Sequence, residues 1–231
     1  MSVLLRNHEQ SVAFALVFSN GIWLYNRPHC YYSVDAMWDQ RYDTSEYVYG
    51  TDPNEFLAGT VADMPAGRTL CLAEGEGRNA VFLAEHGHEV VAVDASAFGL
   101  EKADRLAASR GVHIETVRAD LADFDIETDS WDAIVSIFAH VPPDIRKPLH
   151  RKIVQGLRSG GTLVLEAYTP GQIKLGTGGP PVPEMTMTLA GLREELEGLV
   201  FSHALELERE VIEGRLHTGK GAVVQLVAVK P

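Results

Sequence analysis

The sequence predicts an α/β fold in which a doubly wound, mixed sheet of about seven strands ends in an antiparallel C-terminal strand. Three observations predict it. Strand and helix patterns alternate between residues 69 and 169, which is the order of a parallel sheet with crossover helices. The runs VVAV (90–93) and IVSI (134–137) are apolar on both alternating faces, as expected of strands covered by helices on two sides. Residues 199–230 carry two long strand patterns separated by RLHTGK, which indicates a hairpin.

The first 36 residues are expected to form an N-terminal extension outside the domain, which spans residues 37–231. Their longest apolar stretch, residues 12–18, is about seven residues long, well short of the roughly 20 that a membrane-spanning helix needs. Glu9 offsets the charge of Arg6, and no A-x-A cleavage site follows, so the stretch is a poor signal peptide. We therefore expect no membrane association.

The elements of the domain are assigned from hydrophobic periodicity and from end signals. Ser96 is a candidate N-cap, and Gly160 and Gly161 are expected to end the helix after the fourth strand. The loop 176–185 (GTGGPPVPEM) is long and rich in Gly and Pro, which is typical of functional loops at the rim of a site. The expected helices are 56–63, 78–87, 97–111, 143–161 and 188–198; the expected strands are 69–74, 88–94, 112–120, 131–139, 162–169, 199–214 and 221–230; and 37–54 is a loop or short helix.

The composition is that of an acidic globular protein. Hydrophobic residues make up 45% of the 231 residues and charged residues 23%, as in soluble folded chains. Lys and Arg total 20 against 32 Asp and Glu, a net charge of -12, which disfavours nucleic acid and anionic membranes as partners. A small neutral or cationic molecule is the expected partner, and the sequence leaves the oligomeric state open. With only Cys30 and Cys71, we expect no disulfide framework, no metal site and a cytoplasmic location.

Residues 75–80 (GEGRNA) fit the pattern G-x-G-x-x-[GA], and Asp94 ends the next strand. This is the fingerprint of a Rossmann-like nucleotide-binding fold. A dinucleotide would place its pyrophosphate on this loop, where each carboxylate of Glu74 and Glu76 would oppose it by roughly 4 kcal/mol at about 4 Å and an effective dielectric constant of 20. S-adenosylmethionine has no phosphate, and its sulfonium and ammonium groups favour acidic neighbours. Asp94 suits the ribose of either cofactor, whereas the antiparallel last strand favours a methyltransferase sheet.

Several motifs together form a pattern that is more specific than the glycine loop alone. They are WDQRY and YVYGTDPN, LCLAEGEGRNAVFLA, HEVVAVDASAFGLEKA, RADLADF, WDAIVSIFAHVPP, GLRSGGTLVLEAYTP and GTGGPP. On these motifs the chain resembles a class I S-adenosylmethionine-dependent methyltransferase, most similar to the tellurite-resistance and thiopurine methyltransferase-like group. The resemblance begins at Met37, a candidate start of translation. Cys71 departs from the usual acidic residue and Ala73 from the usual first glycine, and Glu74 is the candidate to replace the lost charge.

The resemblance implies three sets of contacts to S-adenosylmethionine: around its methionine part, around its adenosine, and over the cofactor from the N-terminal side. Ser136 and the residues after it, up to His140, are implied to face the reactive methyl group. Around the methionine part, the implied residues are Glu74, Gly75, Gly77, Arg78 and Asn79. Around the adenosine they are Asp94, Ala95, Asp120 and Leu121. Over the cofactor from the N-terminal side they are Trp38, Tyr42 and Tyr49.

Methyl transfer depends mainly on aligning the acceptor with the methyl group, so a soft or anionic acceptor needs no strong base. His140 is the candidate proton acceptor or substrate contact, because imidazole titrates near neutrality; a structural histidine at a strand end is the alternative. His217, in the predicted hairpin loop, is expected at the surface. Further contacts to the acceptor are expected from Phe138, Glu166, Tyr168, Gly178 and Gly179.

Three functions remain open from the sequence. The first is methyl transfer to a small molecule, such as a thiol, a thiopurine-like sulfur or a metalloid oxyanion such as tellurite. The second is an NAD(P)-dependent Rossmann oxidoreductase. The third is a non-catalytic S-adenosylmethionine-binding protein, which the changes at Cys71 and Ala73 keep open.

Overall fold

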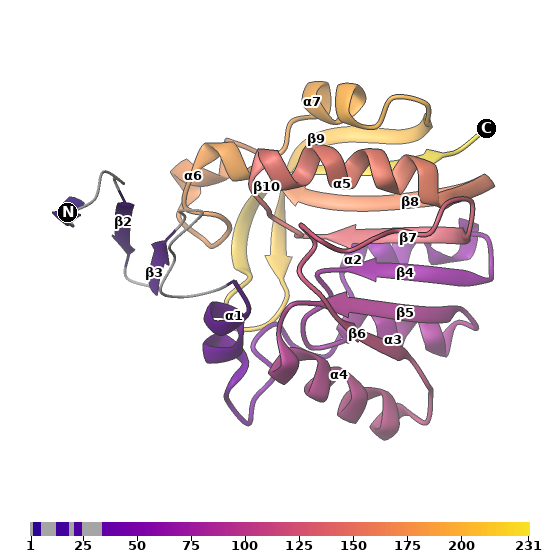
Figure 1. Cartoon of the computed structure of the whole chain (residues 1–231), viewed down its shortest axis with the longest axis horizontal. Coiled ribbons are helices and arrows are strands. Elements are labelled where there is room, and N and C mark those ends of the chain that lie inside the picture. The colour runs from indigo at the N-terminus through magenta and orange to yellow at the C-terminus, as the bar shows by residue number, and fades with distance from the viewer. Residues whose placement is uncertain (1, 6–12, 19–20, 25–33) are drawn as a thin grey trace.

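The computed structural model describes residues 2–5, 13–18, 21–24 and 34–231 (Figure 1). The first three of these ranges are short strands, β1 (Ser2–Leu5), β2 (Ala13–Phe18) and β3 (Gly21–Leu24), which pair antiparallel in that order. The predicted domain boundary at residue 37 falls inside helix α1 (Val34–Tyr42). The predictions that involve Arg6, Glu9 and Cys30 lie outside the described residues.

The main sheet has seven strands in the order β6-β5-β4-β7-β8-β10-β9. The strands from β6 to β8 pair in parallel, and β10 pairs antiparallel with both β8 and β9. The predicted mixed sheet with an antiparallel C-terminal strand is therefore confirmed. The chain runs from β4 outward to β6 and then returns to β7, so the topological switch point, where open sheets bind ligands, lies between β4 and β7. The strands are β4 (Arg68–Leu72), β5 (Glu89–Asp94), β6 (Glu115–Arg118), β7 (Trp131–Ile137), β8 (Leu157–Tyr168), β9 (Val200–Ile212) and β10 (Thr218–Val229).

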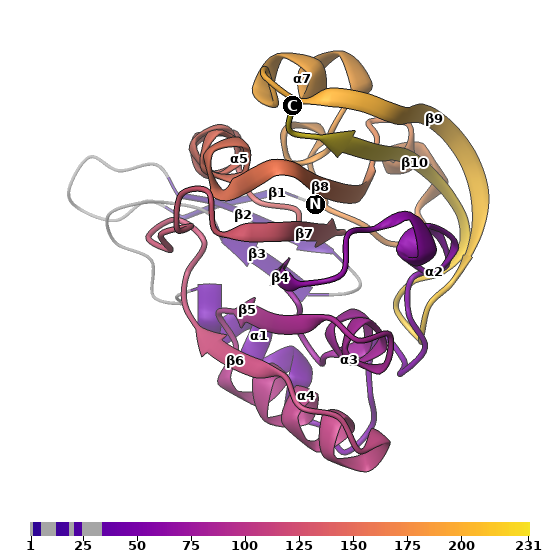
Figure 2. The ribbon, with the colours of Figure 1, turned by 90° about the vertical axis from the view of Figure 1, so that its right-hand side faces the viewer.

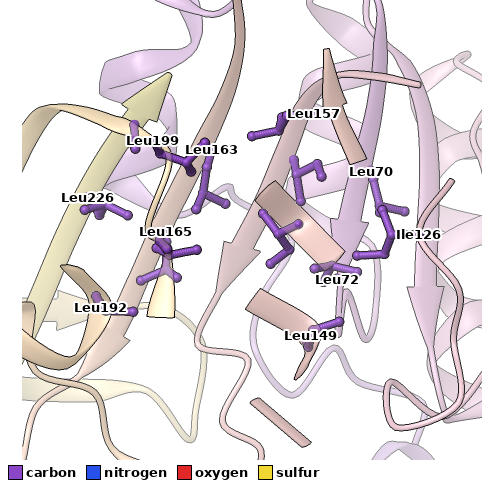
Figure 3. Close-up of a cluster of buried hydrophobic side chains, with 14 of the residues drawn as sticks. Leu70, Leu72, Ile126, Leu149, Leu157, Leu163, Leu165, Leu192, Leu199 and Leu226 are labelled. Carbon is purple, nitrogen blue, oxygen red and sulfur yellow. The ribbon is translucent and has the colours of Figure 1, made fainter. Parts of the chain in front are cut away.

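Helices cover both faces of this sheet, with α3 and α5 on opposite sides (Figure 2). Successive strand residues point to opposite faces, so Leu70 and Leu72 enter one hydrophobic core and Cys71 the other. Helices α5 and α7 close the first core (Figure 3), and α2, α3 and α4 close the second. The helices after α1 are α2 (Glu55–Thr60), α3 (Arg78–Glu85), α4 (Ala97–Arg110), α5 (Pro143–Gly156), α6 (Gln172–Leu175) and α7 (Leu189–Glu195), with 3-10 turns at Val61–Asp63 and Pro183–Met185.

The end signals of α4 are confirmed. The Ser96 hydroxyl accepts a hydrogen bond from the Gly99 N–H at 3.1 Å, which satisfies one of the free donors of the first turn. Gly111 follows the last turn with φ of 71°, a left-handed conformation that glycine adopts without strain. None of the helices in the described part of the chain is long and apolar enough to cross a membrane.

The helix predicted over 143–161 is five residues too long. Helix α5 ends at Gly156, and Leu157 is already extended and fully buried, paired with Trp131 of β7. Gly160 and Gly161 belong to β8, where they exchange main-chain hydrogen bonds with Lys230 at 2.8 and 2.9 Å. Burial of Leu157 and pairing with two distant strands therefore outweigh the local glycine signal.

The third predicted strand is shorter than expected. Residues 112–120 read as one strand, but β6 comprises only Glu115–Arg118. Val112 still bonds to α4, its N–H donating to the Ala107 carbonyl at 3.1 Å, and the Ala119 N–H donates to the Asp94 carbonyl at 2.9 Å. The chain thus enters the sheet late and leaves it at the edge where the cavity described below lies.

Candidate active site

A cavity opens at the carboxyl ends of β4, β5, β6 and β7, and residues from both ends of the domain close it. The turns after the strands form its floor and walls. The segment after α1, the loop 178–180 and the tip of the β9–β10 hairpin form its rim. The lining residues are Trp38, Arg41, Tyr42, Tyr49, Gly50, Ala73, Glu74, Glu76, Arg78, Asn79, Asp94, Ala95, Ala119, Asp120, Leu121, Ile137, Phe138, Ala139, His140, Val141, Gly178, Gly179, Pro180, Leu216 and His217.

Two non-glycine residues in this lining have a left-handed backbone. Ala73 follows β4 with φ of 51°, and Phe138 follows β7 with φ of 53°. Residues with a side chain pay a steric cost of roughly 1–2 kcal/mol in this region, and such strain gathers at functional sites. The Phe138 N–H donates to the Glu166 carbonyl at 2.7 Å, which holds the strained turn in place. The position of Ala73 requires a positive φ, which explains why glycine is the expected residue there.

Glu74 caps the helix that follows the glycine loop. Its Oε1 accepts the N–H groups of Asn79 and Ala80, both at 2.9 Å, at the first turn of α3. Burial raises the pKa of Glu74 to about 7, although these hydrogen bonds and Arg78 act in the opposite direction. A pyrophosphate needs the same donors at the helix N-terminus. It would have to displace a carboxylate that is part of the fold, so the geometry disfavours a dinucleotide.

Glu76 does not offer a free charge to a ligand. Its carboxylate accepts a hydrogen bond from the Lys102 ammonium at 2.7 Å, and both side chains are 2% exposed. The other carboxylate oxygen accepts the Tyr49 N–H at 3.1 Å. Glu76 therefore joins α4 to the segment over the cavity, and of the two glutamates beside the glycines only Glu74 remains the candidate to replace the charge lost at Cys71.

The two glycines of the motif serve packing and do not line the cavity. A Cβ on Gly75 would come within 2.5 Å of the Tyr42 hydroxyl, and one on Gly77 within 2.6 Å of the Ala103 Cα in α4. Both residues also have positive φ, 63° and 91°. Only glycine satisfies both conditions. They allow Tyr42 and α4 to approach closely, and their contact with the cofactor stays a prediction.

Asp94 and Asp120 stand at the ends of neighbouring strands. The Asp94 carboxylate accepts the N–H groups of Gly75 and Ser96, each at 2.8 Å, and burial raises its pKa despite these bonds. Asp120 accepts the Ala122 N–H at 2.9 Å. Both carboxylates line the cavity, so each has a fixed orientation and remaining acceptor capacity for hydroxyl or amino groups.

Aromatic rings from the N-terminal side cover the cavity. The Trp38 and Tyr42 rings stack with centroids 5.6 Å apart, and the Arg41 guanidinium lies 4.7 Å from the centroid of Trp38. Arg41 also donates to the Tyr49 hydroxyl at 3.0 Å. The rings that the resemblance implies over the cofactor thus line this cavity, together with Arg41, which the motif did not single out.

A buried ionic network lies behind the cavity. Arg209 donates to Glu166 through two bonds of 2.8 Å and to Glu213 at 2.8 Å. Asn54 donates to the same two carboxylates, and Arg78 pairs with Glu213 at 2.5 Å. Glu166 is fully buried inside this network and does not line the cavity, so its predicted contact with a ligand is corrected. Arg78 leaves Nη1 buried with no hydrogen-bond partner among the described residues.

His140 has both ring nitrogens engaged. Nδ1 lies 2.9 Å from the Met185 carbonyl, so it carries the proton and donates. Nε2 accepts the Tyr168 N–H at 3.2 Å. Burial lowers the pKa of His140 to about 4, which keeps the ring neutral. This arrangement fixes the loop before α7 to β8 and leaves no free lone pair for a proton.

His217 lies in the site, not at the surface as predicted. Its ring meets three aromatic rings edge to face, with centroid distances of 4.6 Å to Tyr49, 4.9 Å to Phe138 and 5.7 Å to Tyr168. The Arg215 N–H donates to the Val48 carbonyl at 2.9 Å. That bond holds the hairpin tip beside the segment that follows α1 (Figures 1 and 2).

Most of the predicted site residues meet in this cavity. Five do not: Gly75 and Gly77 pack as described, Glu166 lies in the ionic network, Ser136 is buried inside β7, and Tyr168 is fully buried behind Phe138 and Gly179. The sequence missed His217 and Leu216, which no local pattern marks. Within the described residues there is no cluster of His, Cys, Asp and Glu that could hold a metal ion. The predicted residues that line the cavity are Trp38, Tyr42, Tyr49, Glu74, Arg78, Asn79, Asp94, Ala95, Asp120, Leu121, Phe138, His140, Gly178 and Gly179.

Comparison with known proteins agrees with this geometry. Residues 70–161 match the family model of a methyltransferase domain. The chain is 29% identical over 169 residues to the uncharacterized methyltransferase YbaJ of Bacillus subtilis, an alignment that spans 66% of this chain and 65% of that protein.

Solved structures show the same fold at low sequence identity. One, from work on the conversion of a disulfide bond into a thioacetal group during echinomycin biosynthesis, superposes with a TM-score of 0.69 at 18% identity, over 86% of this chain and 92% of the other. TehB from Haemophilus influenzae superposes with a TM-score of 0.64 at 18% identity, over 85% of this chain and 67% of TehB. Residues 70–161 are therefore a methyltransferase domain, of the kind that takes its methyl group from S-adenosylmethionine.

Proposed function

We propose that the whole chain is an S-adenosylmethionine-dependent methyltransferase that acts on a small-molecule acceptor. The observation that carries the proposal is the set of polar groups around the cavity. Glu74, Asp94 and Asp120 present acidic groups, which suit a cation and the hydroxyl groups of a ribose. Glu74 also occupies the helix donors that a pyrophosphate would require.

Arg78 supports the fit to S-adenosylmethionine. Its Nη1 is a donor only, and it is buried without a partner in the described part of the chain. A buried donor without an acceptor carries a desolvation cost of about 1–3 kcal/mol, and more for a charged group. The carboxylate of the cofactor's methionine part would satisfy it. We assign Glu74, Arg78 and Asn79 to that part, Asp94 and Ala95 to the ribose side, and Asp120 and Leu121 to the adenine.

The residues of the chain supply binding, alignment and exclusion of water. When bound, the cofactor supplies a methyl group already activated by its sulfonium. Trp38, Tyr42 and Tyr49 lie over the cavity, where their rings keep water from the reacting atoms. The turn at Phe138 and the loop 178–180 hold the acceptor in line, and proximity of this kind supplies much of the rate of a displacement reaction. We assign His140 to positioning the loop at Met185, since both of its nitrogens are engaged.

The acceptor is proposed from the resemblance and from the shape of the rim. A thiol, a thiopurine-like sulfur or a metalloid oxyanion such as tellurite fits the group that the motifs resemble. Phe138, Gly178, Gly179 and Leu216 line the cavity and offer no charged side chain, which favours a small, mainly apolar molecule. One structural neighbour comes from chemistry at a disulfide, which supports an acceptor that reacts through sulfur.

Titration calorimetry and an acceptor panel test the proposal. We expect S-adenosylhomocysteine to bind and NADH not to bind, because of the Glu74 cap. A panel of thiols, selenite and tellurite should then yield S-adenosylhomocysteine from S-adenosylmethionine with at least one acceptor. Binding of NADH without binding of S-adenosylhomocysteine would favour an oxidoreductase. Cofactor binding without turnover of any acceptor would favour a non-catalytic binding protein.

A further inference from the structure

Arg78 is held at one terminal nitrogen and open at the other. Its Nη2 donates to Glu213 Oε2 at 2.5 Å, and the two side chains are 8% and 2% exposed. Its Nη1 is buried with no hydrogen-bond partner among the residues that the structure describes, although Arg78 lines the cavity. Because the guanidinium is a rigid planar fork, a partner that fixes Nη2 also fixes the direction of Nη1. Glu213 therefore determines where this open donor lies.

The Glu213 carboxylate is itself fixed from the side away from the cavity. Its Oε1 accepts hydrogen bonds from Asn54 Nδ2 and Arg209 Nη2, both at 2.8 Å. Arg209 is held in turn by two bonds of 2.8 Å to the fully buried Glu166. Of the three donors to Glu213, only Arg78 belongs to the cavity lining. A carboxylate in a buried network of this kind keeps its place, so Arg78 adjusts to Glu213 and not the reverse.

The main chain around Glu213 is also held in place. The Glu213 N–H donates to the His217 carbonyl at 2.7 Å, which closes the turn between β9 and β10. The next residue, Gly214, packs so closely on the segment after α1 that a side chain there would collide with the main chain of Tyr49. The hairpin therefore presents the Glu213 carboxylate to Arg78 from a fixed backbone.

Asn54 connects the same support to a second residue of the cavity lining. Its N–H donates to Asn79 Oδ1 at 2.9 Å, while its side chain donates to Glu213. Since Oδ1 of Asn79 is occupied in this way, its Nδ2 group is the part of the amide left to donate to other partners. Asn79 follows Arg78 in the first turn of α3, and both line the cavity. Two neighbouring donors are thus oriented from behind by Glu213 and Asn54.

We propose that Glu213 is a positioning residue for the cofactor, which aims Arg78 Nη1 at the carboxylate of the cofactor's methionine part. This inference rests on the proposed methyltransferase function and deepens it, because it makes recognition of the cofactor's amino-acid end depend on the C-terminal hairpin. Glu213 lies outside residues 70–161, the segment that matches the family model.

Neutralising the charge of Arg78 is the competing role for Glu213. A carboxylate that only neutralised Arg78 would compete with the carboxylate of the cofactor, so its removal would strengthen the contact between cofactor and arginine. A carboxylate that positions Arg78 has the opposite effect. Moving it should weaken the contact even when its charge is kept, because charge-assisted hydrogen bonds weaken steeply when donor and acceptor are misaligned. The two roles therefore predict different results for the same substitutions.

Calorimetry with two ligands isolates the carboxylate contact. One ligand is S-adenosylhomocysteine, and the other is the same molecule with a hydrogen atom in place of its carboxylate. The ratio of their Kd values measures what the carboxylate contributes, independent of the rest of the ligand. In the wild type, we expect the decarboxylated ligand to bind about 10- to 150-fold more weakly, the range for hydrogen bonds to charged groups.

Two substitutions of Glu213 separate position from charge. Glu213→Asp keeps the charge but withdraws it by one methylene group. Glu213→Gln keeps the length, and its amide nitrogen faces Arg78 when its oxygen serves the other two donors. We expect the Kd ratio to fall at least about fivefold in both variants. Arg78→Met should reduce the ratio to about 1, and Glu213→Asp added to Arg78→Met should change it no further, since the effect passes through Arg78.

Glu195→Asp is the matched control. Glu195 is also a buried glutamate, 9% exposed, that pairs with an arginine, Arg146 at 2.9 Å, but neither residue lines the cavity. The same substitution should lower Tm and leave the Kd ratio at the wild-type value. A general loss of stability would thus be distinguished from a loss of the carboxylate contact, which only the variants at Glu213 and Arg78 should show.

An unchanged or larger Kd ratio in Glu213→Asp would overturn the inference. A larger ratio in Glu213→Gln would do the same and would indicate charge neutralisation; this variant decides the matter if Glu213→Asp does not fold. Binding of S-adenosylhomocysteine with a ratio that Glu213 does not alter overturns the inference alone. Failure of the wild type to bind S-adenosylhomocysteine overturns the proposed function, and the inference with it.

Discussion

Single residues at the strand ends carry both the strain and the charges of the site. Ala73 is a residue with a side chain in the left-handed region, and Glu74 directly after it caps α3. Asp94 orients two main-chain N–H groups across the same cleft. The chemistry therefore depends on a few side chains whose conformations the backbone fixes before any ligand arrives.

Replacing Ala73 by glycine should stabilise the protein. The left-handed conformation of Ala73 costs roughly 1–2 kcal/mol, which glycine would not pay. Glycine also has more conformational freedom in the unfolded chain, and this offsets about 0.5–1 kcal/mol of the stabilisation. We expect Ala73→Gly to raise the free energy of unfolding by up to about 1 kcal/mol, a change of roughly 2–4 °C in Tm. Gly75→Ala is the matched control and should lower Tm, because its Cβ would meet the Tyr42 hydroxyl. A lower Tm in Ala73→Gly would contradict the account.

Replacing Asp94 by alanine should weaken the binding of S-adenosylhomocysteine. The loss of charged hydrogen bonds corresponds to about 1–3 kcal/mol, which is roughly a 5- to 150-fold higher Kd. Calorimetry measures it, with Tm recorded to establish that the variant folds. Asp125→Ala, at a carboxylate that is 92% exposed, should bind normally. An unchanged Kd in Asp94→Ala would remove this residue from the site.

The part of the cavity formed by the strand ends could be predicted from the sequence, and the part formed by the hairpin tip could not. The residues from Glu74 to Asn79 and Asp94 follow their strands directly, so a local motif locates them. His217 enters the cavity only because the hairpin tip bonds to Val48, a contact between residues far apart in the chain. Glu76 shows the same dependence on contacts that a local motif does not reveal. Its place between the glycines suggested an acidic neighbour for a cation, but Lys102 in the next helix neutralises it.

At the scale of elements, two helices on one face of the sheet are joined by a buried ionic cluster. Arg146 and His150 of α5 both contact Glu195 of α7, at 2.9 and 2.7 Å. Burial would raise the pKa of Glu195, but the bonds from His150 and Arg146 outweigh it and lower the pKa to about 2. The docking of α7 on α5 thus depends on a charged carboxylate.

This cluster gives the protein a defined response to acid. Since the pKa of Glu195 is lower in the folded state than its usual value of 4.5, its stabilisation is complete above about pH 4.5 and is lost as the pH falls toward 2. We expect Glu195→Gln to be less stable than the wild type at pH 6, with the difference shrinking below pH 4.5. Urea unfolding at several pH values measures it. Glu101→Gln, from an exposed pair, should show almost no difference, and a pH-independent difference in Glu195→Gln would refute the assignment.

Most helices and strands could be predicted from the sequence. The largest error, over residues 157–161, arose because these residues pair with distant parts of the chain. Each of the seven strands of the main sheet overlaps a predicted one, and the pattern is strongest in β4, β5 and β7, where burial on both faces leaves nearly continuous apolar runs. Residues 157–161 were assigned to a helix from their glycines, yet they pair with β7 and with Lys230. Local end signals compete with strand pairing, and the sequence around the end of a helix does not reveal a partner that lies some 70 residues away.

At the scale of the whole molecule, the buried network around Arg209 ties together β8, β9, α3 and the residue that precedes α2. Glu166, at 0% side-chain exposure, and Glu213, at 2%, both pair with this guanidinium, and Glu166 has no other ion pair among the described residues. Removal of one partner from a buried ion pair leaves an uncompensated charge, which costs about 3–5 kcal/mol.

Arg209→Met should therefore destabilise the fold by about 3–5 kcal/mol in chemical unfolding. Arg105→Met, from an exposed pair with Glu101, should cost less than about 1 kcal/mol. The double variant Arg209→Met with Glu166→Gln should recover part of the loss, because it removes one unpaired charge. A loss below 1 kcal/mol in Arg209→Met would show that the network contributes little.

The lining of the cavity is divided between the segment that matches the methyltransferase family model and segments that lie outside it. The strand ends that would hold the cofactor lie within residues 70–161, whereas the rim comes from Tyr49, the loop 178–180 and the hairpin tip at Leu216 and His217. Mutations can therefore accumulate in the rim without disturbing the donor site. A lineage built on this plan is free to exchange one acceptor for another while it inherits the same methyl donor, and similarity confined to the central segment carries no information about the acceptor.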